Sequence, residues 1–253
     1  MVRTLILGGA LVVGLGCGNR AIDEMDEVYF AWDDRRVVCG VSIDDALDNS
    51  LASIGDGIDR AVGDREALIF YAHDPGSEVS FDRLEAVLAS AVDGGAEFLT
   101  FQDFSSNPAD RRGGVALTFD DSDVDDWFDA RDLFLEYGAH VTFFVTRADR
   151  LSETRLDKLR TLEADGHAIE SHGHRHLDAT EVVAEYGLSA WVKDEMVAGL
   201  RDLEAAGFQP TAFAYPFGYR SRRTDAEALR HVGYVRSISW SFRYPGVQDP
   251  CPW

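Results

Sequence analysis

Two carboxylates and two imidazoles in this chain have the types and spacing that metal-assisted hydrolysis needs. Asp120 and Asp121 are adjacent, and His172 and His176 are four positions apart, so one turn of backbone can aim both rings at one ion. One Asp with two His forms a divalent-metal site that leaves positions open for water and substrate. The other carboxylate could then take a proton from water. Taken singly, an Asp-Asp pair is also typical of a helix cap, and a His-x-x-x-His pair of a protein surface.

These residues follow apolar runs that have the composition of buried strands. Four such runs lead directly into polar or turn-forming residues: 68–72 into His73, 115–119 into Asp120, 169–171 into His172 and 213–215 into Pro216. The carboxyl ends of parallel strands lie on one face, where the chemistry of such folds is found. The four clusters are therefore expected to converge on one site.

Strands and helices alternate from Arg36 onward, which predicts a parallel sheet with helices outside it. We expect strands over 37–43, 67–72, 98–101, 115–119, 140–145, 168–171, 212–215 and 234–238. We expect helices over 50–62, 81–92, 124–137, 152–165, 190–206 and 224–232. The predicted fold is α/β, a (β/α)-barrel of seven or eight mostly parallel strands in one domain over 36–253.

The composition is strongly acidic, with 24 Lys and Arg against 45 Asp and Glu and a formal charge of -21. Such a charge argues against a nucleic-acid partner, because the phosphates would be repelled. Acidity of this kind is otherwise typical of a well-solvated, soluble protein.

The first residues have the features of a secretion signal. Arg3 precedes an apolar stretch over 5–15, which is too short to span a bilayer. The following Gly16-Cys17 resembles a bacterial lipoprotein cleavage site. We therefore predict a signal peptide over 1–16, export across the bacterial inner membrane and a lipid on Cys17 that anchors the protein in the cell envelope. The alternative is plain secretion, with Cys17 removed or unused.

Residues 17–35 are rich in Asp and Glu and are interpreted as an acidic tether that docks at its end. If Cys17 takes a lipid, Cys39 and Cys251 remain. An even pair in an oxidising compartment predicts one disulfide. Two buried free thiols are the alternative.

Three segments resemble the motifs of a known family. TFDD at 118–121 looks like the first motif of the polysaccharide deacetylases with a NodB-type domain (carbohydrate esterase family 4). SH at 171–172 together with His176 resembles their second motif, and FAYPFG at 213–218 is similar to their third. The resemblance implies a hydrolase that removes acetyl groups from a polysaccharide.

The resemblance also implies a role for each matching residue. Asp120 would be the general base. Asp121, His172 and His176 would hold a divalent metal, zinc first and cobalt, manganese or nickel as alternatives. The backbone N–H of Phe217 would help to bind the oxyanion, a role that preorganised electrostatics explains.

Two positions depart from the family pattern. Gly173 stands where Ser or Thr is usual, which removes a hydroxyl that stabilises the loop. Ala214 stands where the family has an Arg that orders the general base. Asp120 would then be held by another residue, such as Arg220 or Arg222.

The last motif of the family, an apolar strand ending in a His that acts as general acid, does not follow the third motif here. Residues 36–104 resemble it instead, because the run over 67–72 leads into His73-Asp74. We therefore interpret the chain as circularly permuted, with the family's C-terminal third at the front and a Cys39–Cys251 bridge joining the new termini. His73 would be the general acid, oriented by Asp44 or Asp45. The alternative is a separate small α/β domain with a structural His73.

The predicted reaction removes N-acetyl groups from an N-acetylhexosamine polymer, such as peptidoglycan, a chitin-like glycan or an exopolysaccharide, and releases acetate. Aromatic side chains could stack on its sugars, although core packing is their more usual role: Trp127, Tyr215, Tyr219 and Trp240. Two other functions stay open. An O-acetyl esterase acting on a xylan-type glycan would share the chemistry, and a non-catalytic glycan-binding lipoprotein would suit Ala214 and Gly173.

Overall fold

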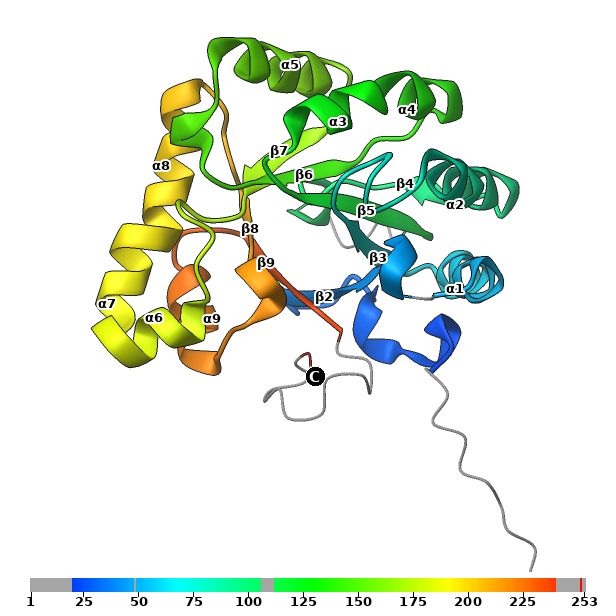
Figure 1. Cartoon of the computed structure of the whole chain (residues 1–253). Helices are drawn as coiled ribbons and strands as arrows, with labels where there is room; N and C mark the ends of the chain where they lie inside the picture. Colours follow the sequence, from blue (N-terminus) through cyan, green and yellow to red (C-terminus); the bar gives the residue numbers. More distant parts are fainter. Residues whose placement is uncertain (1–19, 48, 106–111, 240–250, 252–253) are drawn as a thin grey trace, which may run out of the picture.

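The computed structural model describes residues 20–47, 49–105, 112–239 and 251. Within these residues, seven parallel strands close into a barrel with helices around it (Figure 1). The order around the barrel is β2 (Val37–Ser42), β3 (Ala67–Ala72), β5 (Gly114–Asp121), β6 (Thr142–Val145), β7 (Ala168–Ser171), β8 (Ala212–Ala214) and β9 (Tyr234–Ile238). The predicted (β/α)-barrel is therefore confirmed.

The barrel closes where the first and last parts of the chain meet. β2 pairs in parallel with β9, with Cys39 opposite Ser237. On its other side β2 pairs with β3, which in turn pairs in parallel with β5. Figure 1 shows β2, in blue, between β3 and the orange-red β9. Residues 36–104 thus belong to the same barrel and do not form a separate domain.

Two short strands extend the sheet beyond the barrel. β1 (Tyr29–Phe30) pairs antiparallel with β3. β4 (Glu97–Phe98) pairs with the first two residues of β5, whereas β6 pairs with β5 only from Thr118 onward. β4 therefore covers the part of β5 that β6 does not reach.

The helices follow the strands as the apolar spacing predicts, with four differences, the first being that the helix expected over 224–232 ends at Ala228. They are α1 (Leu51–Asp64), α2 (Phe81–Asp93), α3 (Val124–Asp129), α4 (Arg131–Tyr137), α5 (Glu153–Ala164), α6 (Ala179–Tyr186), α7 (Leu188–Trp191), α8 (Val197–Ala206) and α9 (Arg222–Ala228). The helix expected over 124–137 is divided at Ala130. The helix expected over 190–206 begins as α7 and passes through a π-helical turn, Val192–Met196, before α8. α6 was not predicted, because Ala179 is its one fully buried residue and its sequence shows no continuous apolar face.

The described part of the predicted acidic tether is folded onto the barrel. Ile22, Met25 and Val28 are at most 4% exposed. They stand three positions apart, Ile22 and Val28 in two successive 3-10 turns and Met25 between them, and all three pack into the core. A Cβ at Gly57 of α1 would lie 2.6 Å from the Ile22 side chain, which shows how closely the segment approaches. The acidic residues of this segment thus conceal an apolar repeat of three, through which the described part docks onto the barrel.

The core has two layers, one between the barrel and the helices and one inside the barrel. The inner layer consists mainly of aromatic and small residues, and Phe30, Trp32 and Phe104 pack against one another in it. The Phe30 and Phe104 ring centroids are 4.7 Å apart. Small buried residues such as Ala214 also belong to this inner layer.

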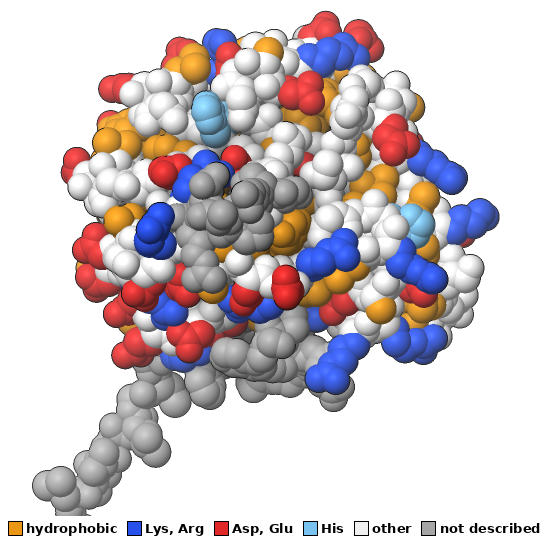
Figure 2. All heavy atoms as spheres, turned by 180° about the vertical axis from the view of Figure 1, so that it is seen from behind, with side chains coloured by type: hydrophobic (Ala, Val, Ile, Leu, Met, Phe, Trp, Pro, Cys, Tyr) orange, Lys and Arg blue, Asp and Glu red, His pale blue; other side chains and the backbone are white. Residues whose placement is uncertain are grey.

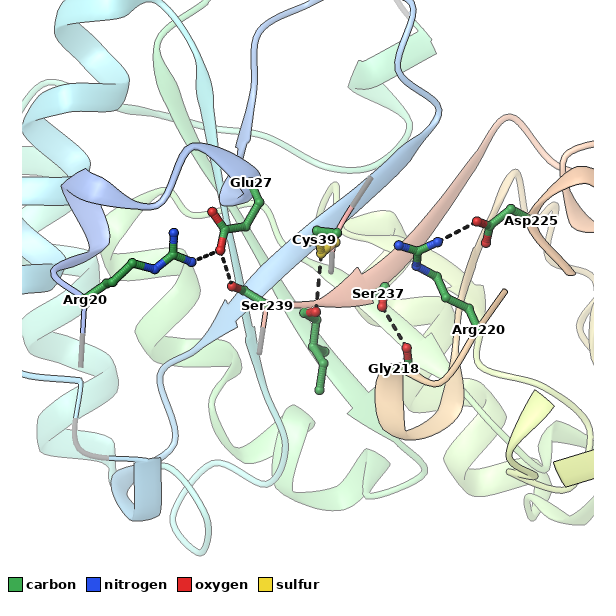
Figure 3. Close-up of a disulfide and its surroundings, with 10 residues drawn as sticks. Arg20, Glu27, Cys39, Gly218, Arg220, Asp225, Ser237 and Ser239 are labelled. Carbon is green, nitrogen blue, oxygen red and sulfur yellow. Dashed lines mark hydrogen bonds and ion pairs between the residues drawn. A yellow bond between two sulfur atoms is a disulfide. The ribbon is translucent and has the colours of Figure 1, made fainter. Parts of the chain in front are cut away.

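Cys39 and Cys251 form a disulfide, with their Cα atoms 5.9 Å apart (Figure 3). Both residues are buried, and the Cys251 Sγ lies 3.3 Å from the carbonyl oxygen of Ile238. The bridge therefore fixes Cys251 against the neighbouring strands β2 and β9. Glu27 lies in the same region, where it accepts a hydrogen bond from Ser239 at 2.9 Å.

The surface carries both signs of charge despite the acidic composition. Figure 2 shows Lys and Arg side chains as well as Asp and Glu on the rear face. Within the described residues no helix combines the length and the apolar character that crossing a membrane requires. The predicted signal peptide over 1–16, Cys17 and Trp240 lie outside the described residues.

Candidate metal and catalytic centre

A cavity of about 380 Å³ lies at the carboxyl ends of the barrel strands. The residues predicted to act together line it: His73, Asp120, Asp121, His172 and His176. The rest of the lining is largely apolar or aromatic and includes Leu47, Tyr71, Phe217, Tyr219 and Ile238. Residues from four separate strand ends therefore converge on one pocket, as the sequence predicts.

Asp121, His172 and His176 lie close enough to share one ion. The Nε2 of His176 is 3.1 Å from Asp121 Oδ1, and the Nε2 of His172 is 3.8 Å from the same oxygen. One ligand atom from each residue lies within 4.8 Å of the other two. Two imidazoles and one carboxylate form a common donor set for zinc and related divalent metals.

The protonation of these groups suits a metal. The Nδ1 of the buried His172 lies 2.9 Å from the Ala214 carbonyl oxygen, so Nδ1 carries the hydrogen and Nε2 keeps its lone pair. Burial lowers the pKa of His172 to about 4, although the Asp120 carboxylate opposes this. Burial alone would raise the pKa of Asp121, but the His176 hydrogen bond and the nearby imidazoles hold it well below its usual range. A neutral imidazole and an ionised carboxylate are the forms that bind metals.

Three non-glycine residues of the pocket have a left-handed backbone. The φ angles are +89° at Asp121, +62° at His176 and +59° at Phe217. Such angles are uncommon for side chains of this size, and each costs on the order of 1–3 kcal/mol. Strain that gathers at one pocket is typical of a functional site, where side chains are held in position at some cost.

Glu195 holds the loop that carries His176. It is 1% exposed, and its carboxylate accepts hydrogen bonds from the backbone N–H groups of Arg175 and Leu177 at 3.1 and 3.0 Å. Gly173 has φ +86°, and a Cβ there would lie 2.6 Å from the Glu195 carboxylate. A side chain at position 173 would therefore collide with Glu195, which comes from the π-helical turn, a feature often found at functional sites.

Asp120 is held by Arg236, not by the arginines that the sequence suggested. Asp120 is 4% exposed and accepts a hydrogen bond from Nη2 of Arg236, a residue of β9 that is fully buried. Arg220 instead donates to Asp225, and Arg222 is exposed at the start of α9. The expectation that Arg220 or Arg222 holds Asp120 is therefore wrong, because the barrel interior brings β9 next to the end of β5.

His73 lies at the end of β3 beside Asp44. Its Nδ1 is 2.8 Å from Asp44 Oδ2, and its backbone N–H donates to Asp44 Oδ1 at 3.1 Å. Burial would lower the pKa of His73, but the Asp44 hydrogen bond and the charges of Asp120, Asp44 and Asp121 raise it to about 9. Asp45 accepts instead from the backbone of Ser80 at 2.9 Å. Of the two residues suggested for orienting His73, the structure places Asp44 there.

The aromatic residues suggested for sugar stacking have different surroundings. Trp127 is fully buried and stacks on Phe143, and Tyr215 is 1% exposed and stacks on Trp191. Both therefore serve the core, although Tyr215 also lines the pocket. Tyr219 lines the cavity and is partly exposed. Phe217 is 51% exposed, with its ring 4.6 Å from that of His176.

Two residues of the site were not identified from the sequence. Arg236 is a single charge in an otherwise strand-like run, YVRSI, and a charged residue at an inward strand position could have indicated it. Glu195 lies in a helical segment among other charged residues. No local sequence signal distinguishes this buried glutamate from a solvent-exposed one.

Comparisons with known proteins agree with this geometry. A family profile described as "Polysaccharide deacetylase" matches residues 107–236, slightly more than half of the chain. A gellan lyase of Bacillus sp. is 34% identical over 123 residues, which are 49% of this chain but 5% of that protein. The chain thus spans only a small fraction of that relative.

Solved structures show the same fold at low sequence identity. IcaB of Ammonifex degensii has a TM-score of 0.55 and 21% identity, covering 68% of this chain and 84% of IcaB. The polysaccharide deacetylase BC0361 of Bacillus cereus has a TM-score of 0.55 and 16% identity, covering 73% and 62%. The deacetylase PplD of Streptococcus pyogenes has a TM-score of 0.51 and 21% identity, covering 64% and 78%. With its motifs, its barrel and the family match over 107–236, this chain belongs to the polysaccharide deacetylase family.

Proposed function

We propose that this protein removes N-acetyl groups from an N-acetylhexosamine polymer and releases acetate. The reaction uses a divalent metal, for which zinc is the first candidate. Peptidoglycan, a chitin-like glycan and an exopolysaccharide are the polymers of this class. The observation that carries the proposal is the convergence of Asp120, Asp121, His172, His176 and His73 on one cavity. This set contains a metal-binding group, a base and an acid, which are the three parts that amide hydrolysis needs.

Asp121, His172 and His176 would hold the metal, which when bound supplies a Lewis acid for the acetyl carbonyl and acidifies water. Asp120, whose Oδ2 accepts a hydrogen bond from Arg236, would accept the proton of the attacking water. The backbone N–H of Phe217, at the cavity wall, is assigned to the developing oxyanion.

His73 donates the proton that the departing nitrogen needs. Its raised pKa, about 9, keeps the imidazole protonated at neutral pH, which is the form that a general acid requires. Asp44 binds Nδ1 and so leaves Nε2 to face the substrate. Base and acid thus come from the ends of the adjacent strands β5 and β3.

The circular permutation is part of this proposal. It is supported by the place of His73 on β3, next to the Asp120 strand, and by the family match, which covers 107–236 and leaves the front of the chain outside it. A closed barrel tolerates new termini because its first and last strands are neighbours. The Cys39–Cys251 disulfide joins two such distant parts of the sequence.

We also propose that the protein is exported and anchored by a lipid on Cys17. The support is the signal-like sequence over 1–16 and the disulfide, since disulfides persist in oxidising compartments. Mass spectrometry of the protein from a bacterial membrane fraction would test this. A mature N-terminus other than Cys17, or a Cys17 without acyl chains, would contradict it.

Acetate release from N-acetylglucosamine oligomers, with the metal content measured in parallel, tests the reaction. The wild type should release acetate, whereas Asp120→Asn and His73→Ala should each lose about 100-fold in kcat while keeping their metal. Equal release by wild type and Asp120→Asn would show that Asp120 is not the base. Loss of metal in His73→Ala would make His73 a ligand instead.

The same assay with O-acetylated xylo-oligosaccharides separates the alternatives. Faster release from the O-acetylated substrate would assign an esterase. Glycan binding without acetate release from either substrate, in protein loaded with Zn²⁺ or Co²⁺, would assign a non-catalytic binding protein.

A further inference from the structure

Arg236 is a buried cation whose hydrogen bonding is incomplete. It is 0% exposed, and Nη2 donates to Asp120 Oδ2. Its Nε and Nη1 have no hydrogen-bond partner among the residues that the structure describes. Buried N–H groups without partners cost free energy, and a buried ion pair is often no more stable than apolar residues of similar size. Stability alone therefore gives no reason for an arginine at this position.

Two aromatic rings flank the guanidinium. Its Cζ lies 5.1 Å from the Phe144 ring centroid and 5.4 Å from that of Tyr71. Phe144 is itself the register partner of Asp120 in the β5–β6 pair. Rings at these distances attract the cation and restrict its movement. The arginine is thus confined at the height of Asp120 inside the barrel.

Ala214 makes room for this arginine from the adjacent strand. It is the direct register partner of Arg236 in the β8–β9 pair and is fully buried within the barrel interior. Neighbouring strands lie about 4.8 Å apart, so an arginine on either strand could bring its long side chain to Asp120. Arginines at both positions would place two cations in one buried space, which is strongly unfavourable.

We propose that Arg236 is the positioning residue for Asp120, and that Ala214 is its complement: the barrel holds one guanidinium, which β9 supplies here and β8 could supply instead. The inference rests on the proposed function, because it assigns Arg236 to the base of that reaction. It predicts that the arginine can be moved between the two positions.

The test compares Arg236→Ala with the double variant Ala214→Arg/Arg236→Ala. Arg236→Ala should lose about 100-fold in kcat on N-acetylglucosamine oligomers, with KM and zinc content close to those of the wild type. The double variant should recover at least about tenfold of that loss, since it restores one guanidinium near Asp120. Arg220→Met is the matched control, because it removes another buried arginine, one that pairs with Asp225. It should keep its kcat.

A wild-type kcat in Arg236→Ala would overturn the inference, and so would a folded, zinc-loaded double variant without recovery. If Arg236→Ala fails to fold, the double variant decides by itself: restored folding and turnover support the relocation, and continued misfolding overturns it. Crystal structures give a readout without activity. The Asp120 carboxylate should move in Arg236→Ala and return in the double variant, even if the wild type proves inactive on every acetylated glycan. A carboxylate that stays in place in Arg236→Ala would refute the positioning role, whereas inactivity alone would refute only the proposed reaction.

Discussion

Asp44 binds both the ring and the backbone of His73, with Oδ2 2.8 Å from Nδ1 and Oδ1 3.1 Å from the backbone nitrogen. Asp44 is held in turn by Ser42, whose hydroxyl donates to it at 3.0 Å. One carboxylate at the end of β2 thus fixes the orientation of an imidazole at the end of β3. The same contact also affects the charge of His73, because it is a main reason why the pKa of His73 is raised to about 9.

This contact predicts the alkaline limit of activity. A general acid must be protonated, so turnover should fall as the pH rises through the pKa of His73. Asp44→Asn removes the carboxylate charge and should lower that pKa, which moves the alkaline limb of the kcat–pH profile down by about one unit or more. Glu78, whose Oε2 is 3.3 Å from Nδ1, remains as a partner and limits the change.

Asp45→Asn is the matched control, because Asp45 bonds to Ser80 and not to His73. Its profile should follow that of the wild type. If the alkaline limb is the same in Asp44→Asn and Asp45→Asn, the titration of His73 does not determine it.

Metal retention should depend on His176 but not on the nearby His174. His176→Ala removes one of three ligands, and the zinc content after dialysis should fall to a small fraction of that of the wild type. In His174→Ala the ion bound by these three ligands should be retained, because His174 pairs with Asp202 at 2.6 Å in a separate group with Asp149. Inductively coupled plasma mass spectrometry measures both. If a folded His176→Ala variant retains its zinc, His176 is not a ligand of the metal.

Glu195 should support metal binding without touching the metal. Glu195→Ala leaves the N–H groups of Arg175 and Leu177 unpaired, so the loop to His176 should loosen. We expect zinc affinity to fall by about 10–100-fold, in a competition titration with a chelating dye. Asp194→Ala, which changes the exposed neighbour, should keep the affinity of the wild type. Equal affinities in the two variants would contradict this role.

The disulfide should contribute substantially to stability. Cys39 and Cys251 are 212 positions apart, so their bridge restricts a large part of the unfolded chain. A bridge of this kind contributes roughly 2–5 kcal/mol, or about 5–15 °C in Tm. Thermal unfolding with and without reductant measures this. Cys251→Ser should unfold at the temperature of the reduced wild type, and a wild-type Tm that reductant leaves unchanged would exclude the contribution.

Much of the barrel could be predicted from local patterns. Apolar runs such as Ala67–Ala72 and helical spacing such as Ile54, Ile58 and Ala61 report burial directly, because side chains that face a core repeat with the period of the element. The burial of residues 20–32 is harder to predict from local patterns. The acidic residues of this segment mask the apolar ones among them. The apolar residues repeat every three positions, as in short 3-10 turns, and so short a repeat is a weak indicator of structure in a sequence.

The sequence by itself determined the chemistry of this protein: which carboxylates and imidazoles are present, in which order, and that each follows a strand. Those features are local, since a strand end is recognisable from its own residues. Only the tertiary structure decided that Arg236 meets Asp120 and that Glu195 supports the loop to His176. Both contacts join residues from separate elements, and their energy depends on distance through the folded protein rather than on separation along the chain.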